Sequence, residues 1–401
     1  MRKRHFLFAS ALALLCSSGA LHAQDFKLTS SGYFKNQGVD VMAFDDIYPE
    51  GHQGGVCIIM NGHRVATNGD IRLEATPGQW QPVPKQLDRK LGDNSITATL
   101  CYPDSSRHLT GFNPMIYPDL QLTYTVKVES KGKNIEVTVD LDRPIPQEFI
   151  GKVGFNLEFF PGSLFGKPWI MDGQSGIFPQ QPNSPLMTTQ PNYLHTGNYH
   201  DGKKSLADMD KLIGKGYSPI VADDIISEPY AKGRKFTSRP DDPYNKVTIE
   251  SLSGDLQLFD GRMNHNNGWF VLCSNLKPGV TKGAVKWIIT PNVVADWMYQ
   301  PVIQTSQIGY HPAQDKEAVI EMDIRDNRKE TAQIIRIDAD GEKVVKNITP
   351  VNWGKFLRYN YLKVDFTDVK EPGLYKIKYD TSVSPIFLPY LMGTVSVMKT
   401  D

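Results

Sequence analysis

The acidic residues that could perform acid–base chemistry occur mostly as adjacent pairs, which is not the spacing needed to flank a bond. Asp45-Asp46 and Asp223-Asp224 lie in stretches typical of loops, while Asp140 and Asp142 fall on one face of an expected strand. Adjacent side chains on an extended chain point in opposite directions, so neither adjacent pair makes an acid–base dyad by itself. Arg143 follows Asp142 and indicates a surface ion pair. We therefore assign no catalytic residue.

The histidines give only a weak indication of a metal site. His195, His200 and Asp201 could meet across a loop, and imidazole and carboxylate groups are common metal ligands. Their spacing fits no ligand pair on a helix or hairpin, so we expect no metal. A Gly-x-Ser-x-Gly nucleophile motif is missing from the sequence, as is a phosphate-binding glycine loop before a helix. We expect no cofactor.

Several tryptophans are candidates for binding carbohydrate. Five of them adjoin a turn-forming or polar residue: Trp80, Trp169, Trp269, Trp297 and Trp353. Sugars stack their C–H faces on aromatic rings, while nearby amides and carboxylates bond the hydroxyl groups. Trp80 lies between two glutamines and Trp269 follows Asn-Asn-Gly, so these two are the predicted carbohydrate-binding residues. The alternative is that both close the end of a hydrophobic core.

The segments that must position these side chains are almost all strands. Apolar and polar residues alternate through 122–128 and 135–141, which predicts a hairpin on a large antiparallel sheet. Asn61-Gly62 and Asn68-Gly69 both predict tight hairpin turns. We therefore expect residues 24–299 to form one large antiparallel β-sandwich. Residues 178–244 are predicted to be a long irregular insertion, with one short helical candidate at 205–213.

The N-terminus has the pattern of a secretory signal peptide at 1–23. Basic residues at 2–4 precede an apolar run at 6–15, and Leu21-His22-Ala23 predicts cleavage before Gln24. The run is too short to span a bilayer, and no other segment is apolar enough to do so. A lipoprotein signal ending at Cys16 is the alternative, but Leu15 is larger than the residue such processing requires. We expect a periplasmic or extracellular protein.

The charge balance and the cysteines reduce the range of possible functions further. The chain contains 44 basic and 44 acidic residues, a balance that gives no attraction for nucleic acid. Cys57, Cys101 and Cys273 follow the signal, all in apolar strand-like runs. We expect buried thiols, with one Cys57–Cys101 disulfide as the alternative that would leave an odd thiol. The spacing of the cysteines does not resemble that of zinc ligands.

Residues 300–384 are predicted to form a second, smaller β-sandwich of the Ig-like, early-set type. Short alternating runs separated by turns roughly every ten residues fit such a domain. Asp340-Gly341 lies between two of these runs and predicts a hairpin. The predicted core residues are Ile334, Ile337, Phe366 and Tyr375.

Two stretches of the second domain carry a resemblance to a known family. Residues 304–312 read Gln-Thr-Ser-Gln-Ile-Gly-Tyr-His-Pro, and residues 364–379 contain Glu371-Pro372-Gly373-Leu374-Tyr375. Both resemble the Ig-like domain that precedes the catalytic barrel of glycoside hydrolase family 9 cellulases. The alternative is another extracellular Ig-like module that shares this pattern by convergence. Residues 48–55, 78–84 and 260–269 resemble the sandwich ahead of that domain in large secreted proteins of Bacteroidetes.

The resemblance implies a part in β-glucan degradation, with the catalytic machinery elsewhere. Family 9 takes its catalytic base from an Asp-Ala-Gly-Asp run in a helical barrel, and this sequence has neither that run nor room for the barrel. Residues 385–401 are atypical for the family, so we expect a frameshift or premature stop near 388. A natural ending with an edge strand is the alternative. The other functional candidates are a free-standing carbohydrate-binding protein and an envelope scaffold.

Overall fold

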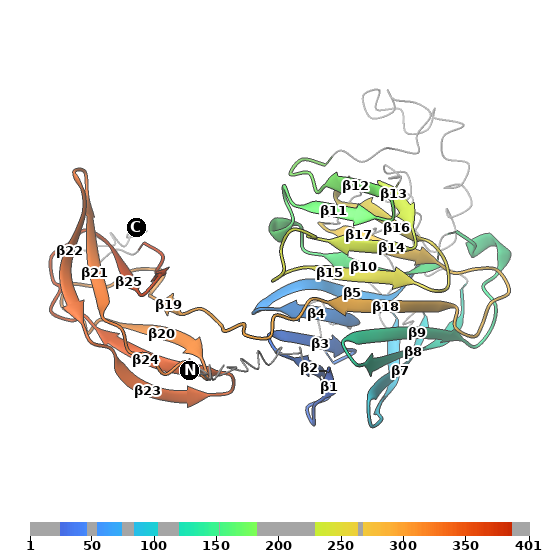
Figure 1. The fold of residues 1–401 in the computed structure, drawn as a ribbon, viewed down its shortest axis with the longest axis horizontal. Helices are drawn as coiled ribbons and strands as arrows, with labels where there is room; N and C mark the ends of the chain where they lie inside the picture. The colour runs from blue at the N-terminus through green and yellow to red at the C-terminus, as the bar shows by residue number, and fades with distance from the viewer. Residues whose placement is uncertain are drawn as a thin grey trace, which may run out of the picture.

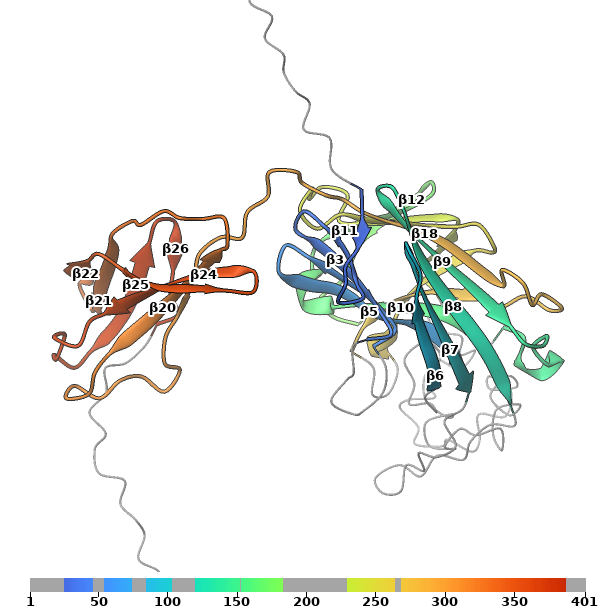
Figure 2. The ribbon, with the colours of Figure 1, turned by 90° about the horizontal axis from the view of Figure 1, so that it is seen from below.

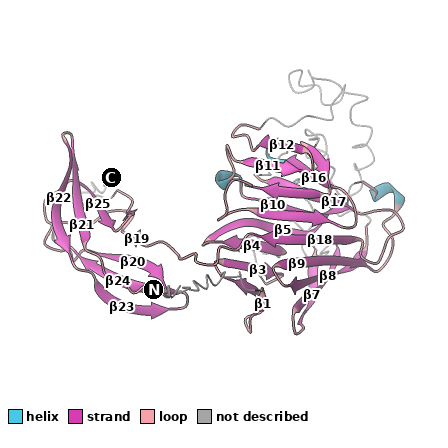
Figure 3. Cartoon of the chain, in the orientation of Figure 1, coloured by secondary structure: helices cyan, strands magenta, loops and turns pink. Residues whose placement is uncertain are grey.

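The protein is built from strands around two large hydrophobic cores. A computed structural model describes residues 25–45, 54–73, 84–102, 120–151, 153–182, 229–263 and 268–386. These residues contain no α-helix and three short 3-10 helices, η1 (Gln147–Phe149), η2 (Pro161–Ser163) and η3 (Gly261–Met263) (Figure 3). The strands form four antiparallel sheets (Figure 1). The predicted all-β fold class is confirmed.

The first sandwich consists of two nine-stranded sheets that face each other (Figure 2). One contains, in spatial order, β1 (Lys27–Leu28), β2 (Phe34–Asn36), β3 (Val39–Ala43), β4 (Val56–Met60), β5 (His63–Leu73), β10 (Val153–Phe159), β17 (Phe270–Asn275), β16 (Leu256–Asp260) and β13 (Ala231–Gly233). The other contains β12 (Gln174–Ile177), β11 (Pro168–Met171), β14 (Lys235–Ser238), β15 (Val247–Ser251), β18 (Val285–Pro291), β9 (Asn134–Leu141), β8 (Leu122–Lys131), β7 (Ser95–Tyr102) and β6 (Lys85–Leu91). Apolar side chains from both sheets meet between them, as where the Phe155 ring meets the Trp287 ring edge-on at 5.0 Å.

Alternation in the sequence sets the faces of the β8–β9 hairpin. Every second residue of both strands is buried, and the intervening residues are partly or fully exposed. Gly132 makes the turn with φ +63°, a conformation that glycine adopts without steric cost. The hairpin predicted for 122–128 and 135–141 is therefore confirmed.

The two Asn-Gly pairs have different roles. Asn61-Gly62 makes the predicted turn between β4 and β5, with φ of 52° and 83°. Asn68-Gly69 lies inside β5, so the hairpin predicted there is wrong. The register of β5 shifts at this point against both β4 and β10, which defines a bulge. A side chain at Gly69 would place its Cβ 2.6 Å from the Cβ of Val56, so the close approach of β4 requires glycine.

One further expectation about the first sandwich differs from the structure, and the alternative of a Cys57–Cys101 disulfide is not borne out. Residues 178–244 are not irregular throughout, because β13 and β14 lie in this segment and pair with β16 and β15. The helical candidate at 205–213 lies outside the described residues. Among the residues that are described, no disulfide forms: Cys57 lies on β4 and Cys101 on β7 of the opposite sheet. The Sγ of Cys57 instead donates a hydrogen bond to the carbonyl of Gly54 at 3.1 Å.

The second sandwich has two four-stranded sheets and its own core. One sheet contains β19 (Val302–Gln304), β20 (Glu317–Asp323), β24 (Tyr359–Asp365) and β23 (Val351–Phe356). The other contains β22 (Gly341–Ile348), β21 (Ala332–Asp338), β25 (Leu374–Tyr379) and β26 (Ser382–Val383). Gly341 makes the predicted turn between β21 and β22 with φ +126°. Because this core is separate from that of the first sandwich, the contacts between the two sandwiches lie at the surface of each.

Three of the four predicted core residues of the second sandwich are confirmed. Ile334, Phe366 and Tyr375 are buried in one cluster. Ile337 is only half-buried. The register between β21 and β22 shifts after Ile334, and Ile335 rather than Ile337 becomes the next buried residue of the strand. The extra residue of this bulge is Val345 of β22, and β21 pairs with β25 without a register shift. Ile337 lies three positions from Ile334 and therefore faces the other side of the strand.

Candidate functional site

The segment that joins the two sandwiches is held against the first one by two aromatic rings. Trp297 packs on Gly38 in the β2–β3 turn, where an added Cβ would lie 2.7 Å from its ring. Tyr299 packs on Gly62 in the β4–β5 turn, where an added Cβ would lie 3.1 Å from its ring. Both glycines have positive φ, +66° and +83°. Because glycine has no side chain, both rings can pack directly against the backbone of these turns.

Polar contacts reinforce this junction from both sandwiches. The carbonyl of Trp297 accepts a hydrogen bond from Gln37 Nε2 at 2.7 Å and another from Arg325 Nη2 at 2.8 Å. Arg358, in the turn between β23 and β24, forms an ion pair with Asp40 of β3 at 3.1 Å. Since the side chain of Asp40 is only 11% exposed, its charge is partly desolvated and depends on Arg358. These contacts join the β23–β24 turn of the second sandwich to β3 of the first and hold the joining segment between them.

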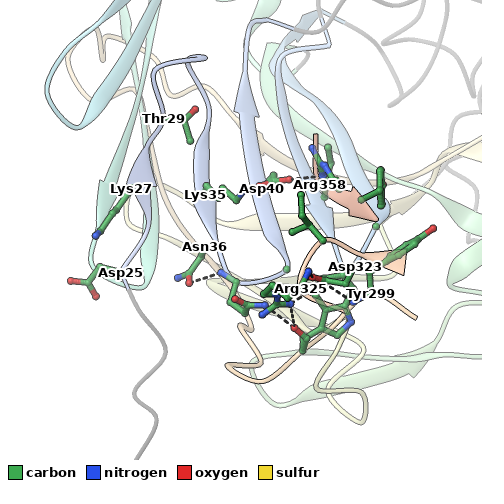
Figure 4. A pocket seen from close by; sticks show the side chains of 17 residues that line it. Asp25, Lys27, Thr29, Lys35, Asn36, Asp40, Tyr299, Asp323, Arg325 and Arg358 are labelled. Atoms are coloured by element: carbon green, nitrogen blue, oxygen red, sulfur yellow. Dashed lines mark hydrogen bonds and ion pairs between the residues drawn. The ribbon is translucent and has the colours of Figure 1, made fainter. Parts of the chain in front are cut away.

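A pocket of about 510 Å³ lies at this junction (Figure 4). Its size falls within the ~300–1,000 Å³ that is usual for small-ligand sites. Lys27 and Lys35 line one side and stand directly opposite each other on β1 and β2. Like charges in that position repel each other, so an electron-rich ligand would be favoured beside them. Trp297, Tyr299 and Tyr359 supply aromatic surface to the same pocket.

Two of the carboxylates that line the pocket, Asp323 and Asp40, form ion pairs with arginines. Asp323 accepts hydrogen bonds from Arg325 Nε and Nη2, both at 2.8 Å, and from the backbone N–H of Arg325 and Tyr299. Burial acts to raise the pKa of Asp323, but the hydrogen bonds from Arg325 and the backbone outweigh it and lower the pKa to about 2. For Asp40, burial outweighs the nearby Arg358 and Lys35 and raises the pKa. These two carboxylates are therefore engaged mainly by Arg325 and Arg358.

Of the two predicted carbohydrate-binding residues, only Trp269 belongs to the described residues, and it does not line this pocket. Trp80 lies outside the described residues. Trp269 is partly buried against Phe259, Val271 and Cys273, and its ring meets that of Phe160 edge-on at 4.5 Å. Its role in carbohydrate binding stays a prediction. Of the other tryptophans considered from the sequence, Trp169 is buried in the core, whereas Trp297 lines the pocket and Trp353 is 59% exposed.

The remaining candidates for chemistry are either surface ion pairs or outside the described residues. Asp142 pairs with Arg143 at 2.8 Å, as predicted, and Asp140 pairs with Lys282 at 3.2 Å. Asp223-Asp224 and the candidate metal ligands His195, His200 and Asp201 fall in 183–228, which the structure does not describe. No group of three or more metal-ligating side chains occurs in the described part of the chain.

A second group of buried polar side chains lies on the neighbouring strands β5 and β10. Asp70 accepts a hydrogen bond from the hydroxyl of Tyr124 at 2.9 Å, and Asn68 donates one to Glu158. Burial raises the pKa of Asp70 to about 6, although the charge of Arg72 opposes the change. Burial likewise raises the pKa of Glu158 against the effect of Arg72. The sequence does not distinguish these residues, because buried and exposed carboxylates on strands occur in the same alternating pattern.

Comparison with known proteins identifies the second sandwich. Residues 298–384 match the family model of the cellulase N-terminal Ig-like domain. The second sandwich is therefore a cellulase N-terminal Ig-like domain, which is consistent with the N-terminal region of a family 9 glycoside hydrolase. No curated protein matches the chain.

Three solved structures show partial likeness. A metagenome-derived glycoside hydrolase family 9 endoglucanase is 29% identical over 22% of this chain and 18% of its own, with a TM-score of 0.20. The chain thus spans less than one fifth of that endoglucanase. The Slr1438 protein of Synechocystis sp. PCC 6803 is 10% identical over 73% of this chain and 100% of its own, with a TM-score of 0.29. HI1317 is 7% identical over 65% of this chain and 93% of its own, with a TM-score of 0.25.

Proposed function

We propose that this chain is the non-catalytic N-terminal part of a secreted family 9 glycoside hydrolase that degrades β-1,4-glucan. The single observation that carries the proposal is the match of residues 298–384 to the cellulase N-terminal Ig-like domain. In this proposal residues 24–299 form the N-terminal sandwich, residues 300–384 form the Ig-like domain, and catalysis belongs to a barrel that is supplied by other residues.

The Ig-like domain has exposed apolar side chains where a barrel would follow in the chain. Val383 on β26 is 49% exposed and Ile386, just beyond it, is 62% exposed. Exposed apolar side chains of this size favour contact with another protein surface. We propose that the barrel packs against this end of the domain and is stabilised by it.

The test is to mix the purified chain with the barrel of a family 9 endoglucanase that lacks its own Ig-like domain. The chain should raise the melting temperature of the barrel, and V383D and I386D should reduce the effect because a charge would be desolvated in the contact. V345D, at a 40% exposed position on β22, is the matched control and should retain it. The chain alone should release no reducing sugar from soluble β-1,4-glucan. Hydrolysis by the chain alone, or no stabilisation of the barrel, would overturn the proposal.

Two parts of the proposal concern export and the first sandwich. Among the described residues, none forms a helix long and apolar enough to cross a membrane. We propose that residues 1–23 direct export to the periplasm or beyond and are removed after Ala23.

We also propose that Trp80 and Trp269 contact glucan on the first sandwich. Substitution of each by Ala should weaken retention on soluble β-glucan, and unchanged retention by a folded variant excludes that residue.

A further inference from the structure

A continuous row of aromatic rings crosses the Ig-like domain and ends at the pocket beside the first sandwich. The successive ring centres are 6.0, 6.0, 5.2 and 6.4 Å apart along Trp353, Tyr361, Tyr359, Tyr299 and Trp297. These five residues, called the aromatic row below, come from β23, β24 and the segment that joins the two sandwiches. Each step is about the length of one pyranose unit in a β-linked chain.

The aromatic row lies on the outer face of its sheet. On β24, Tyr359, Tyr361 and Lys363 alternate with buried residues that belong to the other face. Glu321 of β20 pairs with Tyr361 in the sheet register and therefore shares its face. Trp353 stands at a bulge of the edge strand β23 and is 59% exposed. The rings are thus on the side of the sheet opposite the core.

Polar groups hold the rings of the row in place. Glu321 accepts hydrogen bonds from the hydroxyls of Tyr299 at 3.0 Å and Tyr361 at 3.1 Å, one on each carboxylate oxygen. The ammonium group of Lys363 lies 4.9 Å from the centre of the Trp353 ring. Each carboxylate oxygen has a further lone pair, and Lys363 has further donors, that can bond hydroxyl groups of a ligand. Rings fixed in this way lose little conformational freedom when a ligand binds.

The row and the pocket share surface. Trp297, Tyr299 and Tyr359 belong to the row and also line the pocket of about 510 Å³. Asn36 and Gln37 line the same pocket and supply amide groups. A ligand that follows the row therefore reaches a concave end with hydrogen-bonding side chains, as chain-binding sites require.

We infer that the aromatic row and the pocket form a binding surface for a single chain of soluble β-linked glucan. The choice of glucan rests on the proposed function, whereas the binding surface rests on the rings, their spacing and their polar neighbours. Carbohydrate fits this face better than a protein does, because Glu321 and Lys363 interrupt the apolar surface at intervals and place charged groups beside the rings.

The orientation of the rings selects the form of glucan. Neighbouring rings in the row are turned by 72°, 60°, 59° and 69° relative to each other. A flat crystalline surface requires coplanar rings, and this row has none. A free chain can rotate about its glycosidic bonds and follow the row. We therefore expect retention by soluble glucan and not by crystalline cellulose.

The test is affinity electrophoresis of the full chain in gels that contain hydroxyethyl cellulose, with a pull-down on crystalline cellulose alongside. The soluble glucan should retard the wild type. W353A and Y361A should each weaken binding by about fivefold to tenfold, the usual contribution of one aromatic contact. V351A removes an exposed aliphatic side chain from the same strand and should leave binding unchanged. Unaltered melting temperatures and near-ultraviolet circular dichroism establish that each variant is folded.

Three results would overturn the inference. The wild type could show no retardation, W353A and Y361A could bind as the wild type does, or crystalline cellulose could retain the chain in preference to the soluble polymer. If W353A instead abolishes stabilisation of the catalytic barrel, the row is a protein contact. In each of these cases the proposed function can still stand, because its own test depends on the barrel and on V383D and I386D.

Discussion

Replacement of Asp70 by Asn should change how the stability of the first sandwich depends on pH. Asp70 is 1% exposed, and burial raises its pKa to about 6 from an ordinary value of 3.8. The folded state therefore holds the proton of Asp70 more tightly than the unfolded state does. The resulting stability is complete below about pH 4 and is lost as the pH rises through about 6. One pKa unit corresponds to ~1.4 kcal/mol, so the loss amounts to about 3 kcal/mol.

The substitution isolates the charge because it keeps the hydrogen bonds. One oxygen of Asp70, Oδ1, accepts from both the hydroxyl of Tyr124 at 2.9 Å and the backbone N–H of Ile71 at 2.7 Å. The amide oxygen of Asn can accept from both donors. D70N should therefore unfold with nearly the same free energy as the wild type at pH 4 and should be more stable by up to about 3 kcal/mol at pH 8.

Urea unfolding at several pH values between 4 and 8 measures this difference. Trp287, which is buried in the core of the first sandwich, provides a fluorescence signal from that domain. The matched control is D93N, because Asp93 is exposed in the turn between β6 and β7. Its unfolding curves should follow those of the wild type at every pH. If the free energy of unfolding differs between D70N and the wild type by the same amount from pH 4 to pH 8, the assignment of a raised pKa to Asp70 is refuted.

Three further predictions concern the junction and the N-terminus. G38A places a methyl group in the space that the Trp297 ring occupies, at a backbone φ of +66°. It should destabilise the junction by ~1–2 kcal/mol, which small-angle X-ray scattering would detect as a larger radius of gyration. R358A leaves the buried carboxylate of Asp40 without its ion pair and should speed proteolysis of 292–301, whereas R358K should restore part of the protection. Export should yield a mature chain that begins at Gln24, which N-terminal sequencing of the secreted protein measures directly.

Local alternation in the sequence predicts strands well because it reports a two-faced environment. The β8–β9 hairpin follows from this pattern alone. The pattern fails at bulges, because an extra residue changes which side chain faces the core. Asn68-Gly69 reads as a turn but makes a bulge in β5. Backbone irregularities of this kind depend on the neighbouring strand, which a single sequence does not reveal.

The candidate site was predictable only in part. Trp297 and Trp353 belong to the five tryptophans that adjoin polar or turn-forming residues, but the sequence favoured Trp80 and Trp269 among them. Tyr359 and Tyr361 alternate with apolar residues, so they look like members of an ordinary strand. The ion pair between Asp40 and Arg358 joins residues 318 positions apart, and no local pattern links them. Sites assembled from distant segments require the tertiary fold before their members can be recognised.

The packing of Trp297 on Gly38 and of Tyr299 on Gly62 also limits how the two domains can be combined with domains of other proteins. Trp297 and Tyr299 are separated by one residue, yet each ring rests on a different hairpin of the first sandwich. Insertion or deletion of a single residue between them would lift one ring off its hairpin. Chimaeras that exchange the Ig-like domain should therefore join the chains after Tyr299, so that both rings and both hairpins come from the same parent.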